Sequence, residues 1–221
     1  MKVGTDSIML GSWLQTTDVQ RILDIGTGSG LLAIMLAQKT QGTCLIDGID
    51  IDEDAITQAK ENALNCPWSQ RLTFQHSSLQ EYSVDTCYDL IVSNPPYFPI
   101  NDRANKGLLI NNRLTARQTI QLDHPTLLQA VLKYLSAQGK FCCVLPVEVT
   151  KEFTDTAESL GLYCVKELQV QSKPTADVKR LLLEFSLSDK AKICEKLSIH
   201  NNLGGYSEKY IALCKDYYLN F

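Results

Sequence analysis

Short apolar runs bounded by turn residues recur along the chain and alternate with segments whose apolar positions follow a helical period. A short continuous apolar run predicts a strand that is buried on both faces of a sheet. The predicted strands cover residues 21–25, 43–50, 72–76, 88–93, 140–145, 163–170 and 180–187. The predicted helices cover residues 31–37, 52–65, 123–136 and 150–160, with Gly139 and Gly161 as the stops of the last two; residues 190–221 are predicted as an extended segment and a helix from Ser207.

Strands that alternate with helices are typical of a mostly parallel sheet with helices on both faces. We therefore predict a three-layer α/β fold with seven strands, and one domain over residues 1–221, since no repeat or linker divides the chain. The stretch 94–123 breaks the alternation, because about 30 residues separate a strand from its crossover helix. It follows the carboxyl end of a central strand, where ligands bind in open parallel sheets, and is predicted to serve a site on the substrate side.

The composition is that of a globular protein, with 221 residues of which 44% are hydrophobic. The longest uninterrupted apolar run, residues 31–37, is far shorter than the roughly 20 residues of a membrane helix, and the N-terminus has no signal sequence. We therefore predict a cytoplasmic protein without a membrane partner. The eight cysteines have no C-x-x-C spacing and the three histidines no ligand spacing, which predicts free cysteines and no metal. The oligomeric state is left open between monomer and weak dimer.

A glycine motif, Asp24-x-Gly26-x-Gly28-x-Gly30, lies between the first predicted strand and the first predicted helix. Glycines at such a turn let a ligand approach the N–H groups at the helix start. The third glycine of a dinucleotide fingerprint would fall at Leu31, and no Gly-Lys-Ser/Thr follows as in a P-loop. Asp50 ends the second strand, where related folds offer a carboxylate to a ribose. The motif and Asp50 together predict an adenosine-containing ligand.

The motif Asn94-Pro95-Pro96-Tyr97 ends the fourth predicted strand. Two prolines hold the backbone extended, and so fix where the Asn94 side chain and the neighbouring carbonyls point. An amide oxygen and a carbonyl held together can accept both hydrogens of a planar NH₂ group, which biases the nitrogen lone pair toward an electrophile. Tyr97 adds a ring on which a base can stack. The motif therefore predicts a site for a planar amino group.

The glycine motif and the Asn94 motif together resemble those of class I methyltransferases that use S-adenosylmethionine to methylate planar amino groups. Four further segments are similar to the bacterial tRNA1(Val) adenine-N6 methyltransferases, so that the similarity runs nearly end to end. These segments are Lys2-Val-Gly-Thr-Asp6, Leu10-Gly-Ser-Trp13, Leu122-Asp-His-Pro125 and Tyr206-Ser-Glu-Lys-Tyr210. The resemblance implies a Rossmann-like fold, S-adenosylmethionine as cofactor, and methylation of an adenine N6 in tRNA, beside the anticodon of a valine tRNA.

The resemblance also implies roles for individual residues, with residues 1–19 closing over the cofactor. The implied catalytic residues are Asn94, Pro95, Pro96 and Tyr97; the implied cofactor-binding residues are Thr5, Asp6, Asp24, Gly26, Gly28, Gly30, Asp50, Ile51, Ser78, Leu79 and Asn94. Ser78 stands where the family commonly has an acid facing the cofactor's adenine. That contact is expected to weaken or to pass to the Leu79 N–H.

Two alternatives remain open at this point. The Asn94 motif fits a glutamine amide of a protein as well as an adenine, whereas a binding module without catalysis would be expected to have a damaged motif.

The formal net charge of −4 disfavours nucleic acid, but five acids within residues 47–54 account for its sign, and residues 94–123 carry +2. The bases predicted to contact RNA are Arg103, Lys106, Arg113, Arg117, Lys173, Lys179 and Arg180. The mild charge predicts RNA binding of modest affinity that is sensitive to salt.

Overall fold

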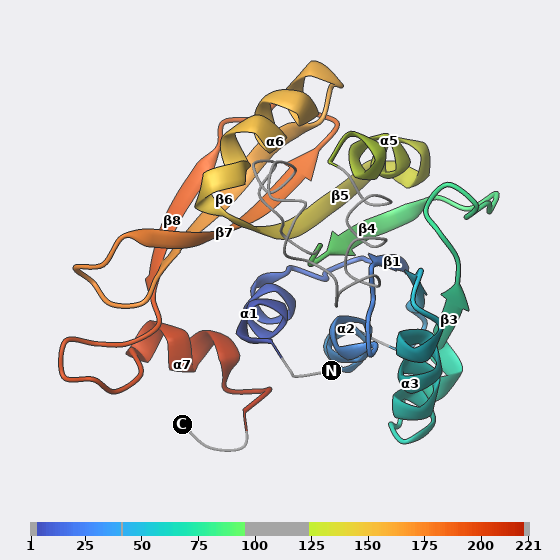
Figure 1. Ribbon diagram of the computed structural model, residues 1–221, viewed down its shortest axis with the longest axis horizontal. Coiled ribbons are helices and arrows are strands. Elements are labelled where there is room, and N and C mark those ends of the chain that lie inside the picture. Colours follow the sequence, from blue (N-terminus) through green and yellow to red (C-terminus); the bar gives the residue numbers. More distant parts are fainter. Residues whose placement is uncertain (1–3, 41, 96–123, 219–221) are drawn as a thin grey trace, which may run out of the picture.

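The computed structural model describes residues 4–40, 42–95 and 124–218 (Figure 1). Strands and helices alternate along these ranges, as predicted. The strands are β1 (Arg21–Ile25), β2 (Leu45–Asp50), β3 (Leu72–His76), β4 (Tyr88–Ser93), β5 (Leu135–Pro146), β6 (Tyr163–Gln171), β7 (Val178–Ser186) and β8 (Ile193–Ser198). The helices are α1 (Thr5–Trp13), α2 (Leu31–Lys39), α3 (Glu53–Leu64), α5 (His124–Tyr134), α6 (Val147–Ser159) and α7 (Glu208–Cys214), with a 3-10 turn at Ser69–Arg71.

The strands form one sheet in the order β3-β2-β1-β4-β5-β7-β6-β8. Only β7 runs antiparallel to its neighbours β5 and β6, so the prediction of a mostly parallel sheet is confirmed. The predicted number of seven strands is one too few, because Ile193–Ser198 adds an eighth strand parallel to β6. This edge strand exposes its first four residues, so it lacks the continuous apolar run by which the other strands are recognised.

Each face of the sheet has its own apolar core. Helices α1, α2, α3 and α7 cover one face, and α5 and α6 cover the other (Figure 1). Cys142 and Cys143, adjacent on β5, belong to opposite cores, because successive strand residues point to opposite faces. All eight cysteines are free, as predicted.

The α5–β5 connection differs from the prediction. Helix α5 ends at Tyr134 and β5 begins at Leu135, so Gly139 lies inside the strand and does not stop the helix. The register between β4 and β5 shifts here, and a Cβ at Gly139 would lie 2.8 Å from the Tyr88 carbonyl oxygen. Gly139 therefore permits two strands to approach closely. Gly161, by contrast, follows α6 with a φ of +80°, as expected of a helix stop.

The sequence does not predict helix α1, because the apolar positions of this segment do not follow a helical period. It packs against α2 so closely that a Cβ at Gly11 would lie 2.7 Å from Met35 Cε. Its carboxyl end is held by Lys39, whose Nζ donates to the carbonyl oxygens of Gly11 at 3.2 Å and Ser12 at 2.5 Å. Among the described helices, none combines the length and the apolar character needed to cross a membrane.

Candidate active site

The glycine motif forms the turn between β1 and α2. Gly26, Gly28 and Gly30 adopt φ angles of 72°, 57° and 79°, a region that L side chains rarely adopt. A Cβ at Gly30 would also lie 2.9 Å from the Phe74 ring, whereas one at Gly26 would meet no described atom within 4 Å. The turn is thus closed by packing at Gly30 and open at Gly26, where a ligand can approach the backbone.

The end of β2 holds this turn in place. The N–H groups of Gly26 and Thr27 donate to the Ile49 carbonyl oxygen at 2.9 and 3.0 Å, and the Gly28 N–H donates to Asp50 Oδ2 at 2.9 Å. The other oxygen of Asp50 accepts the Asp52 N–H at 3.0 Å. A carboxylate oxygen that accepts one N–H has a second lone pair, so this placement is compatible with the predicted ribose contact.

Asp24 lies beneath the same turn and is 1% exposed. Burial raises the pKa of Asp24 to about 7, and the nearby Asp50 charge adds to the rise, while a hydrogen bond from Thr27 Oγ1 opposes it. That hydrogen bond, to Asp24 Oδ2, is 2.6 Å long. A cationic ligand group over this carboxyl would favour its ionised form. The site thus contains a buried acid suited to a positively charged cofactor.

Asn94 follows β4 directly and therefore lies beside the glycine turn. Strand register places Ser93 opposite Ile25, the last residue of β1 before Gly26. The fully buried Ser93 donates from Oγ to the Ile25 carbonyl oxygen at 2.9 Å, which ties the two strand ends together. Sequence reasoning missed Ser93, since a serine that ends a buried strand has no distinctive pattern. Pro95 is buried next to Asn94, whereas Pro96 and Tyr97 lie outside the described residues.

The first turn of α1 meets the Asn94 motif. Nδ2 of Asn94 donates to Ser7 Oγ at 2.8 Å. Next to Ser7, Asp6 forms an ion pair with Arg180 at the start of β7, with Oδ2 3.0 Å from Nε. The predicted cofactor residue Asp6 and the predicted RNA residue Arg180 are thus brought together, and Thr5 is exposed at the helix start. Sequence reasoning missed Ser7, since its role depends on a contact 87 residues away.

The remaining predicted cofactor residues lie around the ends of β2 and β3. Ser78 donates from Oγ to Glu81 Oε2 at 2.8 Å and accepts the Glu81 N–H at 3.2 Å, so its hydroxyl stabilises a local turn. Leu79 is 7% exposed and packs in the core on the α5 side of the sheet. Ile51 is half-buried and follows β2 directly. These placements leave the predicted adenine contacts as predictions.

The described lysines that are predicted to contact RNA lie at the same end of the strands as Asn94. Strand β6 runs parallel to β4, so both carboxyl ends share one edge; Lys173 follows β6 there, and Lys179 lies near the start of β7. Both lysines are exposed. The other four candidates, Arg103, Lys106, Arg113 and Arg117, lie outside the described residues. Within the described ranges, no three His, Cys, Asp or Glu side chains gather as a metal site would require.

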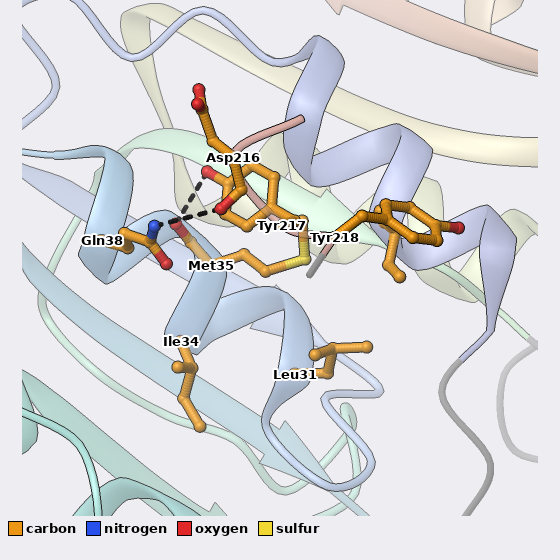
Figure 2. A pocket seen from close by; sticks show the side chains of 8 residues that line it. Leu31, Ile34, Met35, Gln38, Asp216, Tyr217 and Tyr218 are labelled. Atoms are coloured by element: carbon orange, nitrogen blue, oxygen red, sulfur yellow. Dashed lines mark hydrogen bonds between the residues drawn. The ribbon is translucent and has the colours of Figure 1, made fainter. Parts of the chain in front are cut away.

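A hollow of about 290 Å³ lies elsewhere, between α1, the outer side of α2 and the C-terminal segment (Figure 2). Tyr217 Oη donates to the Met35 carbonyl oxygen at 3.3 Å, and Gln38 Nε2 donates to the Asp216 carbonyl oxygen at 3.4 Å (Figure 2). Of the described residues that line it, Leu31 alone adjoins the glycine turn, and none is a predicted site residue. The hollow is therefore distinct from the candidate active site.

Comparison with known proteins assigns the family. The family described as methyltransferase small domain matches residues 2–145. A protein of Pseudoalteromonas atlantica is 46% identical over all of this chain and 93% of its own length, and one of Trichodesmium erythraeum is 41% identical over all of this chain and 92% of its own. Both are named tRNA1(Val) (adenine(37)-N6)-methyltransferase. This chain belongs to that family.

Family membership agrees with the fold and the site. The chain superposes on a predicted O-methyltransferase from Agrobacterium tumefaciens with a TM-score of 0.72, at 15% identity and 96% coverage of both chains, which supports the fold alone. The protein is an S-adenosylmethionine-dependent methyltransferase, as the sequence predicts. The residues present fit this cofactor, since the turn is open at Gly26 and Asp24 and Asp50 are the acids beside it. The role of each residue stays a prediction.

Proposed function

We propose that this protein methylates the exocyclic N6 of an adenine in tRNA, the adenine beside the anticodon of a valine tRNA. One observation carries the assignment to an amino group. Strand register and the Ser93 hydrogen bond place Asn94 and Pro95 directly beside the glycine turn. The relatives that match this chain over its full length are named for the same reaction.

One group of site residues would hold the cofactor, and another would hold the methyl acceptor. Asp50 would accept the ribose hydroxyls, Asp24 would lie near the methionine end, and the open side of Gly26 would admit the cofactor to the backbone. S-adenosylmethionine supplies an electrophilic methyl group when it is bound.

On the acceptor side, Asn94 Oδ1 and the Pro95 carbonyl oxygen would accept the two hydrogens of the target NH₂ group. This holds the nitrogen lone pair out of conjugation with the ring and directs it toward the methyl group. Attack would form the N–C bond as the S–C bond breaks and the neutral thioether leaves, and the nitrogen's extra proton would pass to solvent afterwards, so no base is needed beforehand. Most of the catalysis then comes from positioning. The target base must be unstacked, which is easier in an anticodon loop than in a duplex.

The RNA would be received at the carboxyl ends of the strands, which extend from Asn94 after β4 to His200 after β8. His200, which follows β8, donates its backbone N–H to the Ser172 carbonyl oxygen at 2.9 Å, and so lies beside Lys173. The rings of His200 and Tyr206 stack with centroids 5.2 Å apart, and Tyr206 is 39% exposed. An aromatic pair beside Lys173 suits single-stranded RNA, whose bases stack and whose phosphates pair with cations.

The test is the identity of the methyl acceptor. The protein and labelled S-adenosylmethionine are incubated with tRNA that lacks the modification, and separately with protein extract. Label in tRNA, mapped to N6 of the adenine beside the anticodon, is the expected result. Label in protein alone would contradict the proposal and indicate a glutamine amide as the methyl acceptor, which the same hydrogen-bond geometry also fits.

A further inference from the structure

We infer that the ring of His200 is a stacking platform for one unpaired base of the tRNA, a different base from the target adenine. The inference rests on the proposed function, because it adds a second contact to the same RNA surface. Its starting point is the segment Tyr206-Ser-Glu-Lys-Tyr210, which has no assigned role in the candidate active site. In the structure this segment supports the His200 ring.

Three aromatic rings after β8 stack in series. The rings of His200 and Tyr206 have centroids 5.2 Å apart and planes at 17°, and those of Tyr206 and Tyr210 have centroids 5.4 Å apart and planes at 22°. Tyr210 is 1% exposed and belongs to the core on the α1 side of the sheet, which anchors the series. Within the described residues no other ring stacks on His200, which is half-buried. The accessible end of the series is therefore His200.

The ring of His200 is also held in one orientation. His200 and Tyr206 pair across a loop, and Asn201 Oδ1 braces that loop by accepting the Leu203 N–H at 2.8 Å. His200 Nδ1 lies 3.2 Å from the Ser172 carbonyl oxygen, which can only accept, so Nδ1 is the donor. A ring that is already fixed by packing and by a hydrogen bond loses little freedom when a base stacks on it.

His200 lies at the end of the strands that would receive the RNA, but away from the target adenine. Strand β8 is parallel to β6, and β6 is parallel to β4, so His200 and Asn94 follow strands that end on the same side. Four strand spacings separate β4 from β8, which is roughly 20 Å. This separation exceeds the size of one base, so the base on His200 is not the adenine held by Asn94.

A cation lies next to this ring. The Ser172 carbonyl oxygen accepts the His200 backbone N–H at 2.9 Å, and the next residue, Lys173, is exposed. A ring and a cation side by side suit the base and the phosphate of an unpaired nucleotide. Because every base has a face that can stack, this contact would add affinity without selecting a sequence.

The first experiment measures the Kd of tRNA that lacks the modification, by filter binding at about 50 and 200 mM salt. We expect His200→Leu, which removes the ring, to weaken binding about five- to ten-fold, near the lower end of what one base–aromatic stack contributes. The factor should be the same at both salt concentrations, because stacking releases no counterions. His200→Phe keeps a flat ring and should bind within about two-fold of the wild type.

Two results of this experiment would overturn the inference. An equal loss in His200→Phe and His200→Leu would mean that His200 acts through a hydrogen bond. A loss that shrinks at the higher salt concentration would mean that it pairs with a phosphate.

The matched control is Tyr163→Leu. Tyr163 is also half-buried, but it begins β6 and so lies at the opposite end of the strands. Its tRNA affinity should equal that of the wild type, and a loss as large as in His200→Leu would overturn the inference. In His200→Leu the kcat at saturating tRNA should stay within about two-fold of the wild type, since a contact made equally before and during the reaction affects binding only.

A second experiment locates the base. A set of tRNAs is prepared, each with one abasic nucleotide in the anticodon loop and with the target adenine intact. At one position the missing base should weaken binding to the wild type about five- to ten-fold and to His200→Leu less than about two-fold, because the ring and the base are two halves of one contact. Equal losses for both proteins at every position would overturn the inference.

These measurements separate the inference from the proposed function. Methylation of tRNA with an affinity that does not depend on His200 would overturn the inference alone. A wild type that binds tRNA through His200 and methylates none would uphold the stacking platform and count only against the proposed reaction. A wild type that binds no tRNA would contradict both.

Discussion

The two halves of the active site are built in different ways. On the cofactor side, backbone groups form most of the contacts over short sequence distances, as between the Gly28 N–H and Asp50, 22 residues apart. On the acceptor side, side chains from distant elements meet: Asn94 and Ser7 are 87 residues apart, and Asp6 and Arg180 are 174 apart. A backbone-built site is recognisable as a local motif, whereas a side-chain-built one exists only after the chain has folded.

The difference also predicts how each half responds to mutation. No substitution except proline removes a backbone N–H, so changes on the cofactor side act through bulk, backbone strain or buried charge. On the acceptor side, truncating a side chain removes the interacting group itself. Substitutions on the acceptor side should therefore affect turnover, and those on the cofactor side should affect cofactor affinity.

The largest effect is expected from Asn94→Ala. It removes one of the two acceptors for the target NH₂ group, so we expect kcat for methyl transfer to fall about 100- to 1,000-fold, the range found when one preorganised transition-state contact is removed. The Kd for S-adenosylmethionine, measured by calorimetry, should change only a few-fold. Turnover that survives this substitution would contradict the role of Asn94, and equal losses in kcat and cofactor affinity would contradict the division into halves.

A second substitution tests the cofactor side by bulk alone. In Gly26→Ala the new Cβ meets no described atom, so the substitution costs about 1 kcal/mol of backbone strain at a φ of 72° while it occupies the open side of the turn. We expect cofactor affinity to fall about ten-fold or more. Gly161→Ala is the matched control, since Gly161 has a φ of +80°, equally open surroundings and a place after α6. If both variants bind the cofactor equally well, the turn is not the binding surface.

The buried acid of the cofactor side predicts a pH dependence. Because the pKa of Asp24 is about 7 in the folded protein and 3.8 ordinarily, its contribution to stability is full below about pH 4 and is lost as the pH rises toward 7. Between pH 5.5 and 7 this amounts to about 2 kcal/mol of the free energy of unfolding. Urea unfolding should show the decline in the wild type and a flatter profile in Asp24→Asn. Saturating S-adenosylmethionine should reduce the decline, since its positive charge favours the ionised carboxyl.

The same contrast explains how much could be predicted from the sequence. The strand positions, the glycine turn and the Asp52 cap of α3 follow from local patterns, and all are present in the structure. Helix α1 does not follow, since it has no helical period, and β8 follows only as an extended segment and not as a strand of the sheet, since its first positions are exposed at the sheet edge. The Ser7–Asn94 contact and the pairing of Asp6 with Arg180 depend on tertiary packing, which no spacing in the sequence encodes.

The smallest effects are expected from the basic residues of the acceptor side. Lys173→Ala and Lys179→Ala should each weaken tRNA binding about two- to four-fold and reduce the salt dependence of the affinity by about one unit of slope or less, because each lysine is exposed and can neutralise one phosphate. Lys190 is an exposed lysine that precedes β8, at the opposite end of the strands, so Lys190→Ala should change neither the tRNA affinity nor its salt dependence.

Arg180→Ala should differ from these three lysine substitutions, since Arg180 pairs with Asp6 and so supports the turn that carries Ser7. Its loss should lower kcat more than tRNA affinity; a pure loss of salt-dependent affinity, measured by filter binding from 50 to 200 mM salt, would instead make Arg180 an ordinary phosphate contact.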